Sequence, residues 1–166
     1  MRPGAVSKHS RFSRQYDQGA YLRGAILQKW NSLVHPGRYR SDAARLASIN
    51  ELVTGWQHQL THDEVTMDEI VEPAFALLRE VSRRTTGLFH YDEQILGGLT
   101  LVRGGISEMA TGEGKTLAVS LPAFVYSLFG RGVHVITVNS YLAERDYEFS
   151  KPIFDYLDIS IAYLPE

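Results

Sequence analysis

The chain has 166 residues, of which 44% are apolar, and this is enough for one domain with a hydrophobic core. It contains no cysteine, which excludes disulfides, thiol catalysis and cysteine-based zinc sites. The formal net charge of −2 hides an asymmetry, because residues 1–40 carry eight Lys and Arg against one acid and the remaining residues carry nine against eighteen. A basic leader on an acidic body favours an anionic partner, either a membrane or a nucleic acid.

The first segment of the chain combines arginine and serine with almost no acid. We expect residues 1–15 to form a basic flexible tail. One interpretation of this tail is the binding of an anionic partner. A second is an organelle transit peptide, which has a similar composition, and a third is a solvated tail without a partner. From residue 16 to residue 34, apolar side chains recur at helical spacing until Pro36 and Gly37. This spacing predicts a first helix.

A second helix is predicted where apolar residues recur three and four positions apart from Leu46 to Leu60, with Ser41 as the N-cap. Residues 66–69 then have the form of a capping box, which marks the start of another helix.

Pro73 would lie well inside a helix that begins at this capping box. We therefore expect a break there and a fresh helix from Pro73 to about Arg84, with Gly87 near its end. Residues 16–86 together are predicted to form a helical N-terminal region.

The most informative motif is the octet Met-Ala-Thr-Gly-Glu-Gly-Lys-Thr at residues 109–116. Its two glycines allow a tight turn that brings backbone N–H groups to an anion, the lysine supplies a positive charge, and the threonine hydroxyl can ligate Mg²⁺. Met109 stands where the strict pattern has glycine, which favours the helicase-type variant of the motif. The predicted phosphate-binding residues are Gly112, Glu113, Gly114, Lys115 and Thr116, with Thr116 also the predicted metal ligand.

The sequence around the octet predicts alternating strands and helices. Short apolar runs typical of strands stand at residues 99–102, 106–109, 133–138 and 159–163, and a buried helix is predicted over residues 116–129. A strand, a phosphate loop, a helix and a second strand form a βαβ unit with a parallel sheet. The expected fold class is α/β, with an incomplete parallel sheet over residues 87–166 after the helical region.

Further short segments surround the loop in a fixed order: Ala74-Phe75-Ala76 with Arg79-Glu80, Asp92-Glu93-Gln94-Ile95-Leu96-Gly97-Gly98, Leu121-Pro122-Ala123, Gly132-Val133-His134-Val135 with Thr137-Val138-Asn139, and Tyr141-Leu142-Ala143 with Arg145-Asp146. In these segments and in the loop, the chain from Pro73 to Pro165 resembles the SecA family, the ATP-driven motor of bacterial preprotein translocation. The resemblance implies that the sheet is part of a RecA-like, P-loop NTPase domain.

What the resemblance implies for function is specific. ATP and Mg²⁺ would be the cofactors, and Gln94 would read the adenine edge through its amide, which offers both a donor and an acceptor. From the residues alone, Gln94 would be a solvated residue in a turn. The implied partners are the membrane protein-conducting channel, preproteins and anionic phospholipid, with nucleic acid not expected. The implied location is cytoplasmic, peripherally associated with the inner face of the cell membrane.

Two positions depart from the family pattern, which usually has a basic residue at Ala110 and an aspartate at Ser140; the coupling to a motor could be altered there. Past the loop, the sequence shows no apolar strand ending in Asp-Glu and no second motor domain. We therefore expect the chain to be the N-terminal part of such a motor and not to turn over ATP by itself. Two alternatives stay open: a fragment of a nucleic-acid helicase of the same superfamily, and a non-catalytic nucleotide-binding or interaction module.

Overall fold

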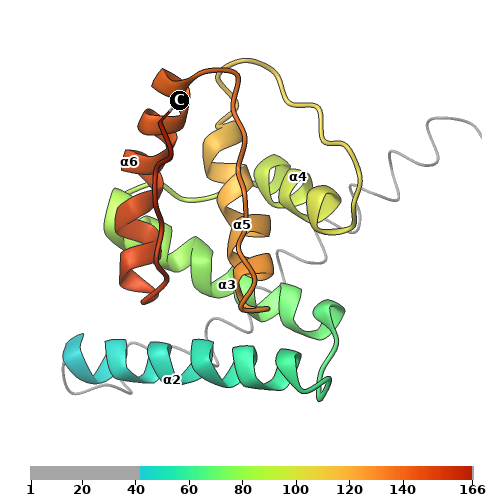
Figure 1. Ribbon diagram of the computed structural model, residues 1–166, viewed down its shortest axis with the longest axis vertical. Helices are drawn as coiled ribbons and strands as arrows, with labels where there is room; N and C mark the ends of the chain where they lie inside the picture. Colours follow the sequence, from blue (N-terminus) through green and yellow to red (C-terminus); the bar gives the residue numbers. More distant parts are fainter. Residues whose placement is uncertain (1–41, 166) are drawn as a thin grey trace, which may run out of the picture.

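The computed structural model describes residues 42–165, and these residues form a group of packed helices (Figure 1). The helices are α2 (Asp42–Thr61), α3 (Met67–Thr86), α4 (Asp92–Val102), α5 (Lys115–Ser127) and α6 (Ser140–Tyr156). Helix α5 packs against α4, α3 and α6, and α3 also packs against α6. The predicted tail, the predicted helix over residues 16–34 and the predicted N-cap Ser41 lie outside the described residues.

Helix α3 forms the middle of the core. Most of its side chains from Ile70 to Ser82 are buried, and its apolar ones belong to the same hydrophobic core as apolar side chains from α2, α4, α5 and α6. Phe75 on α3 and Phe124 on α5 are among the largest side chains that are fully buried. The second predicted helix is confirmed by α2, which lies across one end of the group (Figure 1) and contributes Trp56 and Leu60 to the core. None of the helices in the described part of the chain combines the length and the apolar character that a membrane span requires.

The predicted parallel sheet is wrong, because the described residues contain no β-strand. Residues 99–102, predicted as a strand, form the last turn of α4. Residues 106–109, 133–138 and 159–163 are segments without helix or strand. The last of these runs back beside α6, where the rings of Tyr163 and Tyr147 lie 6.4 Å apart. The α/β fold class is therefore corrected to an arrangement of helices.

Two physical reasons account for this difference. A short apolar run is compatible with a buried helix as well as with a strand, and Leu99 and Val102 are buried as helical residues. A strand also needs a neighbour that accepts and donates its ladder hydrogen bonds. In the described residues, the segment 133–138 has no such neighbour, and Val135, Ile136 and Val138 are 53%, 89% and 88% exposed.

The capping box at the start of α3 is confirmed. The backbone N–H and the hydroxyl of Thr66 both donate hydrogen bonds to the Glu69 carboxylate, each at 2.8 Å. The bond from the backbone is the main cause of a lowered pKa at Glu69. At the other end, Gly87 has a φ of 74°, the left-handed conformation that glycine adopts easily after a helix.

The predicted break at Pro73 is wrong, since α3 continues through it. A proline inside a helix removes one backbone hydrogen bond and typically costs about 3 kcal/mol. Pro73 is itself buried, and Ala74, Phe75 and Leu77 beside it are fully or almost fully buried. We attribute the unbroken helix to this burial, because apolar contacts along the whole helix outweigh one missing bond.

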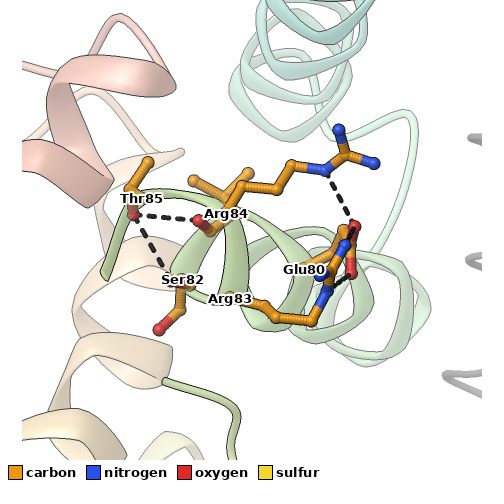
Figure 2. Close-up of polar contacts among 6 residues, drawn as sticks. Glu80, Ser82, Arg83, Arg84 and Thr85 are labelled. Atoms are coloured by element: carbon orange, nitrogen blue, oxygen red, sulfur yellow. Dashed lines mark hydrogen bonds and ion pairs between the residues drawn. The ribbon is translucent and has the colours of Figure 1, made fainter. Parts of the chain in front are cut away.

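The last turns of α3 hold a buried carboxylate between two arginines (Figure 2). Glu80 accepts hydrogen bonds from Arg83 at 2.5 and 2.8 Å and from Arg84 at 2.8 Å. Burial alone would raise the pKa of Glu80, but the hydrogen bonds and charges of the two arginines together lower it. Cations near a helix C-terminus also complement its dipole, so this cluster stabilises the end of α3 from which the chain leads to α4.

Candidate functional site

The predicted phosphate loop lies directly before α5. Gly112 and Gly114 have φ values of 89° and 75°, a left-handed conformation that residues with a Cβ rarely adopt. Gly114 is the N-cap of α5, and Lys115 is its first residue, so the predicted helix after the loop is confirmed. The loop therefore lies at the start of a helix, where anions are favoured, and the Glu113 N–H donates a hydrogen bond inside the loop to the Ala110 carbonyl at 3.3 Å.

The loop is closed by contacts with the backbone of Ala110. The Lys115 ammonium donates a hydrogen bond to the Ala110 carbonyl at 2.8 Å, and the Glu113 carboxylate accepts one from the Ala110 N–H at 2.7 Å. Lys115 and Glu113 are otherwise exposed. Because Ala110 takes part through its backbone, a different side chain at this position would leave these two bonds available.

Gln94 connects α4 to the loop. Its side-chain oxygen accepts from the Tyr91 N–H at 2.9 Å, and its side-chain nitrogen donates to the Glu113 carbonyl at 2.9 Å. Gln94 is only 6% exposed, so the alternative interpretation as a solvated residue in a turn is wrong. A Cβ added to Gly114 would collide with this amide, which gives a second reason for glycine at position 114.

Thr116, the predicted metal ligand, contacts a carboxylate on another helix. Its hydroxyl donates a hydrogen bond to Oδ1 of Asp146 on α6 at 3.0 Å. The same carboxylate oxygen accepts two bonds from Arg145, at 2.7 and 3.0 Å. Oxygen atoms are the ligands that Mg²⁺ prefers, so the Thr116 hydroxyl fits the predicted ion, and Asp146 places a carboxylate beside this hydroxyl. The sequence does not link Asp146 to Thr116, because the two residues are thirty positions apart; the structure shows the contact.

His90 is a second residue that the sequence does not assign to the site. It is fully buried, and its Nε2 lies 2.9 Å from the carbonyl oxygen of Leu117, in the first turn of α5. Arg79 on α3 donates to the His90 carbonyl at 3.0 Å. Burial lowers the pKa of His90 to about 4; the bond to Leu117 opposes this effect and the charge of Arg79 adds to it. The neutral imidazole thus holds the α3–α4 connection against α5, the helix that follows the loop.

Comparison with known proteins identifies the family. The SecA DEAD-like domain family matches residues 23–166. The "Protein translocase subunit SecA" of Elusimicrobium minutum is 43% identical over 141 residues, which cover 84% of this chain and 16% of that protein. The proteins of the same name from Legionella pneumophila (strain Corby) and Leptospira biflexa are 50% identical over 99 residues and 39% identical over 157 residues.

The matched part is a small share of these relatives. The segment aligned to the Legionella protein covers 60% of this chain and 11% of that protein, and the segment aligned to the Leptospira protein covers 84% and 17%. The chain thus spans about a sixth or less of the length of the relatives that it matches. The family match covers most of the chain and includes α2 to α6, the loop and Gln94. This chain belongs to the SecA family.

Proposed function

We propose that this chain is the ATP-binding part of a preprotein translocation motor. The observation that carries the proposal is the loop before α5, where two left-handed glycines bring backbone N–H groups and Lys115 to one helix start. A phosphate group is the ligand that such a loop suits best, because its negative charge meets the N–H groups, the helix dipole and an ammonium together. The family to which the chain belongs supports the same role.

Each predicted site residue has a role in this proposal. The backbone N–H groups of residues 112–116 and the Lys115 ammonium hold the phosphates, so Lys115 and the Glu113 N–H both exchange the Ala110 carbonyl for a phosphate oxygen. Thr116 offers its hydroxyl oxygen to Mg²⁺, which neutralises phosphate charge when bound. Gln94 reads the adenine edge, and for this its amide must release the Glu113 carbonyl or the Tyr91 N–H.

The wider role is also a proposal. We infer that residues 87–166 form the nucleotide-binding part and that α2 and α3 belong to a helical region before it; the predicted tail over residues 1–15 and the start of the predicted helical region lie outside the described residues. The motor's partners would be preproteins and the protein-conducting channel, at the cytoplasmic face of the membrane. The basic residues 1–40 would contact anionic phospholipid there, at about 1 kcal/mol for each basic side chain near the surface.

Titration calorimetry with ADP and Mg²⁺ tests the nucleotide site. Lys115→Ala removes a charge-assisted hydrogen bond, and we expect a loss of about 1.5–3 kcal/mol, or about 10- to 100-fold in affinity. Lys151→Ala is the matched control, because Lys151 is an exposed lysine on α6 whose partner is Asp155. It should bind ADP as the unchanged chain does. Equal ADP affinity of the unchanged chain and Lys115→Ala would contradict the proposal.

A further inference from the structure

The contact between Thr116 and Asp146 joins the start of the phosphate-loop helix to α6. Asp146 lies in the second turn of α6, and its side chain is 21% exposed. Its Oδ1 atom accepts one hydrogen bond from Thr116 and two from Arg145. Three donors from two helices therefore hold this oxygen in place, and the carboxylate carries its negative charge next to the hydroxyl that the proposed function assigns to Mg²⁺.

The direction of this hydrogen bond matters for metal binding. A hydroxyl has one proton to donate and two lone pairs that can accept a proton or bind a cation. The carboxylate of Asp146 can only accept, so Thr116 must use its proton in this bond. Both lone pairs of the Thr116 oxygen then remain for a cation, and the rotation of the hydroxyl is fixed. Acceptors placed in this way behind a metal ligand orient it and strengthen its bond to the metal.

We propose that Asp146 is a positioning residue for Mg²⁺. It holds the Thr116 hydroxyl so that the lone pairs of the hydroxyl oxygen point toward the ion. The inference rests on the proposed function, since it concerns the metal that accompanies the nucleotide. Asp146 touches neither the nucleotide nor the ion in this proposal; it acts through Thr116. In the part of the chain that the structure describes, Asp146 is the carboxylate hydrogen-bonded to Thr116.

The test compares ADP binding in Mg²⁺ with ADP binding in EDTA, by calorimetry on the full chain. In the unchanged chain, Mg²⁺ should raise the affinity for ADP. In Asp146→Ala, we expect this Mg²⁺-dependent gain to fall about tenfold or more, while the affinity in EDTA stays the same. Asp155→Ala is the matched control, because Asp155 lies on the same helix and pairs with Lys151. It should keep the whole gain.

A double-mutant cycle separates positioning from simple packing. Thr116→Ala should lower the Mg²⁺-dependent gain at least as much as Asp146→Ala does, and adding Asp146→Ala to it should cause no further loss. Should Asp146→Ala fail to fold, Asp146→Asn carries the test; it keeps the shape and an acceptor oxygen but not the charge, and we expect a smaller loss of the same gain.

Several results would overturn the inference. If Asp146→Ala lost the same ADP affinity in Mg²⁺ and in EDTA, Asp146 would only hold α5 against α6. If the Mg²⁺-dependent gain in ADP affinity stayed unchanged in Asp146→Ala, the hydrogen bond to Thr116 would play no part in metal binding. A further loss in the double variant would equally exclude action through Thr116. If the unchanged chain bound no ADP in either condition, the proposed function itself would fail, and this result is distinct from a loss confined to Mg²⁺.

Discussion

Replacing Phe124 by alanine is expected to lower the free energy of unfolding by about 3–5 kcal/mol. Phe124 is fully buried on α5 and belongs to the core that all the described helices share. The change removes most of a large apolar side chain and leaves a cavity that the surrounding helices fill only in part. Because small domains are stable by only about 5–15 kcal/mol, the variant should be close to unfolding at room temperature.

Urea unfolding followed by circular dichroism measures this difference. The matched control is Tyr141→Ala, since Tyr141 is an aromatic residue on α6 that is 72% exposed. Its unfolding free energy should stay within about 0.5 kcal/mol of that of the unchanged chain. A loss below about 1 kcal/mol for Phe124→Ala would show that α5 is not packed into the shared core through Phe124, and the placement of Lys115 and Thr116 at its start would then need revision.

Acid is expected to destabilise the chain through His90. The buried imidazole keeps its neutral form, with a pKa of about 4 against 6.5 in the unfolded chain. Between these two values the unfolded chain binds a proton that the folded chain does not, so the stabilisation is complete above pH 6.5 and declines as the pH falls toward 4. The difference between the two pKa values corresponds to about 3 kcal/mol.

The measurement is the free energy of unfolding at pH 7 and at pH 4, in the unchanged chain and in His90→Gln. Glutamine keeps a donor for the Leu117 carbonyl but takes up no proton in this range. The acid loss should be smaller in the variant by about 3 kcal/mol. His134→Gln serves as the control because His134 is exposed, and it should lose as much as the unchanged chain. An identical acid loss in His90→Gln would contradict the role of His90.

Local signals explain what the sequence predicted correctly about the fold. The apolar spacing of α2, the Thr66 capping box and the glycine after α3 each depend on residues within one or two turns. The absence of strands from the described residues could not be predicted in the same way. An apolar run such as residues 133–138 forms a strand only when another segment pairs with it, and this depends on the packing of distant parts of the chain.

The residues of the candidate site are likewise of two kinds: those that a local motif predicts and those that only the packing of distant segments brings together. The glycines, Lys115 and Thr116 follow one another in the chain, so a motif could find them, and the structure places them together at the start of α5. Asp146 and His90 reach the site over thirty and twenty-seven positions through the packing of α6 and of the α3–α4 connection. No spacing in the sequence indicates these two contacts.

A crystal structure of the chain with ADP and Mg²⁺ tests the central claim most directly. We expect the phosphates to lie against the N–H groups of residues 112–116, with the Lys115 ammonium moved from the Ala110 carbonyl to a phosphate oxygen. We also expect Mg²⁺ beside the Thr116 hydroxyl and the adenine within hydrogen-bond distance of Gln94. Nucleotide bound elsewhere on the chain, or a loop still closed by Lys115 on Ala110 at saturating ADP, would contradict the account.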